Sequence, residues 1–101
     1  MASEEKRAHQ RTRVRYAVRV RCGTGGEFAG VVENLGALGA FISTPDFDVP
    51  LEVGQRVSLS VVRADAAPFD AEGEIVRLEQ EFSGGDIRRC FAVRFDAEVS
   101  R

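Results

Sequence analysis

Two arginines near the start of the chain have the type and the spacing to bind an anion. Arg7 and Arg11 stand four positions apart, and Lys6 adds a third cation beside the first of them. A guanidinium carries a planar fork of donors, so it can bind a phosphate, bond the Hoogsteen edge of guanine or stack on a base. Two such groups on one arm could close over a small anionic nucleotide, although the same spacing also occurs in solvated basic tails.

A second stretch contains the turn around which the rest of the chain is organised. Apolar pairs at residues 31–32 and 41–42 indicate strands, and Asn34, Gly36 and Gly39 lie between them. Asn and Gly tolerate positive φ, so the chain can reverse there. A glycine also lets a ligand approach the backbone closely. A plain hairpin turn could carry the same residues, and it is the arginine pair upstream that favours a binding site.

Charge is distributed unevenly along the chain. The net charge of the whole chain is −2, but residues 1–21 carry +5 and residues 22–101 carry −7. A basic segment on an acidic body predicts an anionic partner that is bound by the segment. The acidic body argues against long nucleic acid as that partner, because phosphates beyond the arm would be repelled.

Alternation of apolar and polar residues predicts strands along most of the chain. From Arg13 to Cys22 apolar residues occupy every second position, apart from Ala17 within the polar series, which is typical of a half-buried strand. The strand that begins at Phe69 loses this alternation near Ile75, which indicates a bulge or a bend. The expected strands are residues 13–22, 28–35, 38–44, 57–61, 69–79 and 91–95.

Six strands with short turns and no convincing helix predict an all-β fold, a small antiparallel β-barrel. Closing the sheet hides edges that so short a chain could not otherwise cover. We expect one domain of residues 13–101, preceded by a flexible basic arm of residues 1–12. Residues 96–101 leave room for little or no C-terminal helix.

Several other classes of protein do not fit the sequence. No apolar run approaches the ~20 residues of a membrane span. The charged N-terminus lacks the apolar segment of a secretory signal, so we expect a cytoplasmic protein without membrane insertion.

Cys22 and Cys90 lie in apolar runs and are expected to be small buried residues, although a disulfide is possible. One histidine and two distant cysteines make no metal site. No Ser/His/Asp or Cys/His set is evident, so we expect neither a cofactor nor an enzyme.

The arginine pair, the alternating strand and the Asn-to-Gly turn together resemble the PilZ family. The resemblance extends from Lys6 to about Asp96 and includes Phe41, Ile42 and the final Phe-Ala-Val-Arg-Phe run. It implies a six-stranded barrel of the split-barrel type. It also implies a ligand, the bacterial second messenger cyclic di-GMP, and a signalling role through an effector protein that the sequence does not identify.

The resemblance also assigns roles to individual positions. In PilZ domains an arginine pair grips guanine and phosphate, which implies this role for Arg7 and Arg11. The turn motif of the family is Asp or Asn-x-Ser-x-x-Gly, so Asn34 takes the position of the carbonyl acceptor and Gly39 that of the closing glycine. Gly36 stands where the family has serine, and the lost hydroxyl hydrogen bond weakens binding by about 1 kcal/mol.

Two other functions stay open. The departures at Gly36 and at Leu38, where PilZ domains often have glycine, fit a domain that has lost its ligand and serves as a protein-interaction module. The third hypothesis is a general nucleic-acid-binding barrel. His9, Arg13 and Arg15 could add ligand contacts, but each also fits a solvated surface residue. Four phenylalanines could form a stacking platform, but their alternation with polar or small residues predicts core positions: Phe28, Phe41, Phe91 and Phe95.

Overall fold

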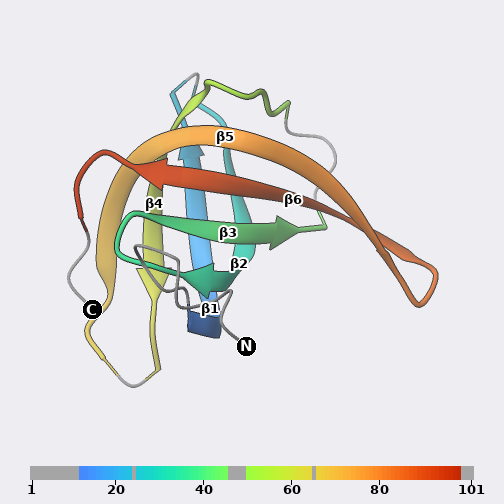
Figure 1. Ribbon diagram of the computed structural model, residues 1–101, viewed down its shortest axis with the longest axis horizontal. Helices are drawn as coiled ribbons and strands as arrows, with labels where there is room; N and C mark the ends of the chain where they lie inside the picture. Colours follow the sequence, from blue (N-terminus) through green and yellow to red (C-terminus); the bar gives the residue numbers. More distant parts are fainter. Residues whose placement is uncertain (1–11, 24, 46–49, 65, 99–101) are drawn as a thin grey trace, which may run out of the picture.

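A computed structural model describes residues 12–23, 25–45, 50–64 and 66–98 of the chain. Six strands close into an antiparallel barrel in which neighbours follow the order β1-β2-β3-β6-β5-β4 (Figure 1). This confirms the predicted fold. None of the described residues is helical, so this part of the chain holds no helix that could span a membrane. The strands are β1 (Thr12–Cys22), β2 (Glu27–Leu35), β3 (Gly39–Thr44), β4 (Arg56–Val62), β5 (Phe69–Ser83) and β6 (Asp86–Phe95).

Apolar side chains from alternate positions of the strands fill the barrel. On β1, Val18 and Val20 are buried, whereas Arg19 between them is exposed. Phe28 and Phe91 meet in the interior, with ring centroids 5.9 Å apart in an edge-to-face arrangement that aromatic pairs favour. The removal of these side chains from water is the main term that stabilises the barrel.

The two cysteines are members of the buried apolar set, as predicted. Neither Cys22 nor Cys90 forms a disulfide, and both are buried. Burial raises the pKa of the Cys22 thiol, so this side chain is a neutral, weakly reactive group at neutral pH.

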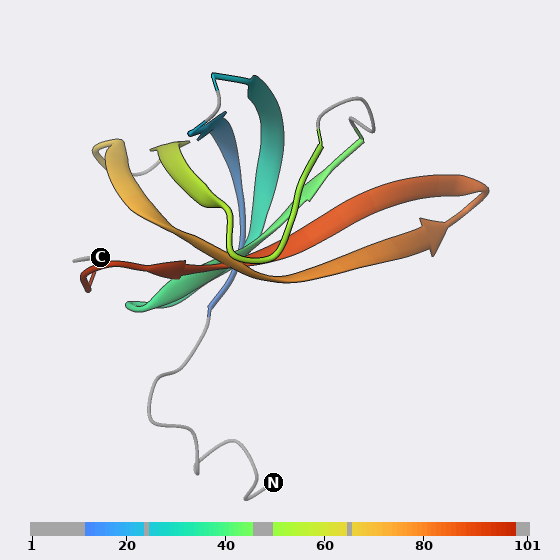
Figure 2. The same cartoon turned by 90° about the horizontal axis from the view of Figure 1, so that it is seen from above.

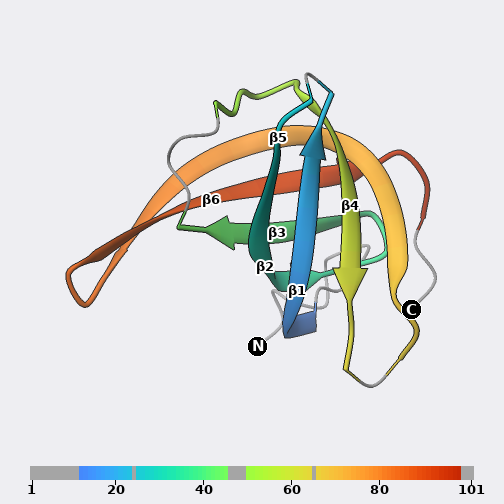
Figure 3. The same ribbon diagram turned by 180° about the vertical axis from the view of Figure 1, so that it is seen from behind.

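β5 and β6 form a long hairpin that extends beyond the barrel, as Figures 2 and 3 show from two further directions. β4 covers β5 only over residues 69–74, whereas β6 pairs with β5 over residues 73–83. The β5–β6 register shifts between Ile75 and Arg77, which confirms the irregularity predicted near Ile75. A bulge bends a strand and increases its twist, so one strand serves both the barrel wall and the projecting hairpin.

Candidate functional site

The first strand begins against the turn that follows β2. Thr12 pairs with Leu35, and Arg13 pairs with Asn34. β1 therefore starts one residue earlier than predicted. The residue before Thr12 is Arg11, so the predicted arm joins the barrel at this turn. The candidate residues of the arm lie outside the described part of the chain: Lys6, Arg7, His9 and Arg11.

Backbone hydrogen bonds close the turn between β2 and β3. The Gly36 N–H donates to the Gly39 carbonyl oxygen at 2.9 Å, and the Phe95 N–H donates to the Leu38 carbonyl oxygen at 2.8 Å. Positive φ occurs, among the described residues, at Gly25, Gly54, Gly84 and Gly85. Asn34 and the two glycines of this turn do not use it. The expectation that positive φ reverses the chain here is wrong, and the hydrogen bond to β6 holds the turn instead.

Gly39 is a glycine because the neighbouring strand leaves no room for a side chain. A Cβ built at Gly39 would lie 2.5 Å from the Val93 carbonyl oxygen, closer than real Cβ contacts come. Gly39 is buried and pairs with Arg94 of β6. The missing side chain therefore lets β3 approach β6 closely.

Irregular pairing surrounds Asn34 at the end of β2. The register of β2 shifts close to Asn34 against both β1 and β3, and such bulges re-aim side chains and often border functional sites. The carboxylate of the adjacent Glu33 accepts a hydrogen bond from Ser43 Oγ at 2.7 Å and lies 3.7 Å from Arg15 Nη1. These contacts hold the irregular segment in place and leave Asn34 half-buried.

A row of cross-strand neighbours runs from Asn34 over the outer face of the sheet. Asn34 pairs with Phe41, and Phe41 pairs with Ala92 of β6. Ala92 pairs in turn with Arg77 of β5, and directly paired residues of antiparallel strands share a face. Arg77 Cζ lies 5.7 Å from the centroid of the Phe41 ring, within the range of a cation–π contact. The row thus combines an amide, a flat ring and a guanidinium.

The predicted core position is wrong for Phe41. Ala40 and Ile42 point inward and are buried, so Phe41 between them faces outward and is half-buried. The strand alternates between its two faces, and the inward face of β3 is taken by its neighbours. The core positions of Phe28, Phe91 and Phe95 are confirmed.

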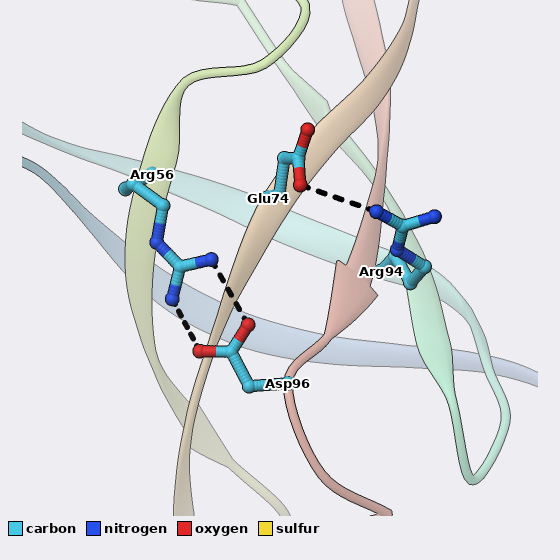
Figure 4. A network of polar contacts seen from close by, with 4 residues as sticks. All are labelled: Arg56, Glu74, Arg94 and Asp96. Carbon is cyan, nitrogen blue, oxygen red and sulfur yellow. Dashed lines mark hydrogen bonds and ion pairs between the residues drawn. The ribbon is translucent and has the colours of Figure 1, made fainter.

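A charged network lies beside the turn on the neighbouring strands (Figure 4). Arg94, the cross-strand partner of Gly39, donates from Nη2 to Glu74 Oε1 at 3.2 Å and keeps 66% of its side chain exposed. Arg56 donates two hydrogen bonds to the Asp96 carboxylate. These bonds hold the pKa of Asp96 below its ordinary value of 3.8. Arg94 therefore offers an exposed guanidinium next to the turn.

The arrangement suits a flat, anionic ligand. Asn34 can accept hydrogen bonds, the Phe41 ring offers a stacking surface, and Arg94 supplies positive charge. Within the described ranges, no cluster of His, Cys, Asp and Glu could hold a metal ion. Sequence reasoning found Asn34 but missed Phe41, Arg77 and Arg94, because only the strand register brings them beside the turn.

Comparison with known proteins decides the family. The sequence matches the PilZ domain family over residues 5–101. The chain belongs to the PilZ family. The resemblance predicted from the arginine pair and the turn is therefore confirmed, and no curated protein matches the chain significantly.

Several solved structures share the fold of this chain at low sequence identity. The PilZ domain of YcgR from Escherichia coli with c-di-GMP has a TM-score of 0.75 and 14% identity, covering 90% of this chain and 78% of that one. The Bacillus subtilis inhibitor of motility MotI/DgrA has a TM-score of 0.75 and 13% identity, covering 94% and 44%. The K. pneumonia MrkH–c-di-GMP complex has a TM-score of 0.71 and 14% identity, covering 90% and 44%. This PilZ chain therefore spans less than half the length of the last two proteins.

Proposed function

We propose that this PilZ domain is a non-catalytic receptor for cyclic di-GMP, which binds between the N-terminal arm and the turn of residues 34–39. The observation that carries the proposal is the pairing of Thr12 with Leu35, because it joins the arm to the barrel beside that turn. Two of the similar structures, YcgR and MrkH, contain the same ligand. We place this activity in the bacterial cytoplasm.

The arm supplies the cationic part of the proposed site. Arg7 and Arg11, with Lys6 beside them, bind the phosphates and the Hoogsteen edge of guanine through charge-assisted hydrogen bonds. Asn34 lies where the arm meets the barrel, and its side-chain carbonyl accepts hydrogen bonds from guanine N–H groups. The ligand is held by protein groups alone, with no cofactor and no metal.

The outer face of the sheet extends the proposed site beyond the family motif. Guanine can stack on the Phe41 ring or on the Arg77 guanidinium, which lies over that ring. Arg94 is exposed beside Gly39 and can supply a further cation for phosphate. These three residues set how the ligand lies on the barrel once the arm has closed over it.

The proposed output is a change in the position of the arm. A ligand that bridges the arm and the turn favours one arrangement of residues 1–11 relative to the barrel. An effector protein that binds better to that arrangement is then recruited or released, because a ligand shifts populations by its differential affinity.

Isothermal titration of the intact chain with cyclic di-GMP tests the proposal. We expect a saturable heat signal with a micromolar Kd or tighter, equivalent to about −8 kcal/mol or more. The mononucleotide GMP serves as the control and is expected to give no saturation over the same range. A flat titration up to about 500 μM cyclic di-GMP, about 500-fold above that Kd, contradicts the receptor function.

Gly36 favours one alternative, a PilZ domain that has lost its ligand and acts as a protein-interaction module. The position that carries serine in the family motif has no hydroxyl here. Under this alternative, capture of the effector is the same with and without cyclic di-GMP, and Arg7→Ala does not change it. A dependence of capture on the nucleotide excludes the alternative.

A further inference from the structure

The projecting β5–β6 hairpin has a backbone edge that no described strand covers. The cover of β5 by β4 ends at residue 74. At Ile75 the N–H donates to the Gln55 carbonyl oxygen, and the carbonyl oxygen accepts from the Gly54 N–H. Residues 77–83 pair with β6 on one side and with no described strand on the other. Such an edge presents free N–H and C=O groups to which another strand can bind.

The hairpin turn shows which residues direct their backbone groups toward this edge. Gly84 and Gly85 have positive φ, and Ser83 pairs with Asp86 across them, as in a two-residue hairpin. The pair that flanks such a turn exchanges hydrogen bonds, and the bonding direction alternates along a strand. The residues whose N–H and C=O groups point away from β6 are therefore Leu78, Gln80 and Phe82.

The same residues carry an exposed apolar surface. Leu78, Gln80 and Phe82 share one face of β5, and Phe82 pairs with Ile87 of β6. Phe82 is 72% exposed, Ile87 46% and Leu78 36%. Natural proteins protect a free edge with charged side chains, above all lysine, with proline, with bulges or with a covering segment. Residues 76–83 contain neither lysine nor proline, and the charged residues Arg77 and Glu79 belong to the opposite face of β5 from Leu78, Gln80 and Phe82, so the apolar face of this edge stays open to pairing.

We propose that two copies of this chain dimerise through this edge, with the two β5 strands antiparallel about a two-fold axis at Gln80. The free stretch of residues 77–83 is centred on residue 80. Antiparallel pairing about this centre places Leu78 opposite Phe82 of the second copy, and symmetry repeats the contact. Each facing pair exchanges two backbone hydrogen bonds. The edge is therefore complementary to itself.

Neighbouring segments select this register. A shift of two residues toward the barrel would drive the hairpin turn of one copy into the segment at Gly54 and Gln55 of the other, which already bonds Ile75. On the opposite face, Glu79 stands opposite Glu81 of the second copy, but Arg77 Nε already lies 2.6 Å from Glu79 Oε2. This ion pair compensates the charge of the Glu79 carboxylate.

The dimer buries only a hairpin from each copy, so we expect it to be weak and dependent on concentration. Sedimentation velocity of the intact chain from about 5 to about 500 μM should show a monomer that converts to a dimer, as expected for a small transient interface. Phe82→Lys should stay monomeric, because it places a charge in the apolar contact. Gln80→Pro should also stay monomeric, because proline removes only the N–H that points to the free edge.

Two controls separate this interface from general surface effects. Val53 is 61% exposed outside the hairpin, and Val53→Lys should dimerise like the unsubstituted chain. Gln80→Cys should form an intermolecular disulfide, because facing Cα atoms about 5.5 Å apart allow one. Val62→Cys, at a position that is 58% exposed on β4, should not. A chain that stays monomeric throughout the range overturns the proposal. The proposal is also overturned if Phe82→Lys dimerises as strongly as Val53→Lys, or if Gln80→Cys and Val62→Cys cross-link equally.

Discussion

Gly36 and Gly39 lie in the same turn, but the barrel constrains them differently. At Gly39 a Cβ would overlap the Val93 carbonyl oxygen. Gly36 has no positive φ, and its N–H, which any residue except proline would keep, donates to Gly39. The departure of this chain from the PilZ turn motif is thus the loss of one hydroxyl at a buried position whose φ does not require glycine.

Gly36→Ser should therefore tighten the binding of cyclic di-GMP. One regained hydrogen bond is worth about 1 kcal/mol, or about fivefold in Kd. The Tm of the ligand-free domain should not change, since the φ of residue 36 suits L-amino acids. Titration and thermal melting of the variant check both results. Weaker binding together with a lower Tm would show that the turn is built around the glycine.

Arg11→Ala should have a large effect on binding and little effect on folding. A charge-assisted hydrogen bond to the ligand is worth about 2–3 kcal/mol, so Kd should rise roughly 30- to 150-fold. The Tm should stay the same, because Arg11 precedes the first strand of the barrel. Arg19→Ala is the matched control, since Arg19 is an exposed arginine that pairs with Glu27 at 2.9 Å. Normal binding by Arg11→Ala, or a loss shared equally by Arg19→Ala, contradicts the clamp.

At the scale of elements, the close approach of β3 to β6 depends on Gly39. Gly39→Ala should lower the free energy of unfolding by about 1–3 kcal/mol, the usual cost of forcing extra atoms into a packed site. Urea unfolding should show a lower midpoint with an unchanged m-value. Gly26→Ala, where no atom lies within 4 Å of the added Cβ, should change stability by no more than about 0.5 kcal/mol. Equal stability of the two variants would show that β3 and β6 can separate at no cost.

The strands were predictable because the alternation of apolar and polar residues follows the alternation of buried and exposed side chains along a strand. The inward residues of β1 and β4, and the irregularity at Ile75, follow from the pattern of apolar side chains. The projecting hairpin was not predictable, because the pattern of β5 continues past the point where β4 ends. Which strand lies beside another depends on contacts between residues far apart in the chain, and no local pattern records them.

The candidate site was predictable only in part for the same reason. Asn34 stands out through its place between two apolar runs. Phe41 looked like a core residue, because an aromatic residue within an apolar run fits either face of a strand. Arg77 and Arg94 look like ordinary outward residues until the register places them beside Phe41 and Gly39.

At the scale of the whole molecule, a hydrogen-bonded ion pair between Arg56 and Asp96 links β4 to the segment that follows β6. β5 lies between β4 and β6 in the barrel. The bond from Arg56 lowers the pKa of Asp96 in the folded state below its ordinary 3.8. The ion pair between Arg56 and Asp96 therefore stabilises the fold at pH values above the ordinary pKa of aspartate. This stabilisation is lost as the pH falls through the lowered pKa of Asp96 in the folded state.

Asp96→Asn should accordingly destabilise the domain at neutral pH and much less in acid. The difference in unfolding free energy between the original chain and the variant should shrink as the pH falls below about 4. Urea unfolding at several pH values measures it. A difference that is constant from neutral to acid pH would show that the charge of Asp96 does not contribute.

The measurement that tests the receptor function most directly is a nitrogen-15 NMR titration of the intact chain with cyclic di-GMP. We expect amide shifts to gather at residues 34–39 and on the outer face at Phe41 and Arg94, and we expect Arg11→Ala to suppress them at the same ligand concentration. Shifts centred instead on the hollow lined by Arg21, Arg56 and Glu72, or an unchanged spectrum at a large excess of cyclic di-GMP, would rule out the proposed site.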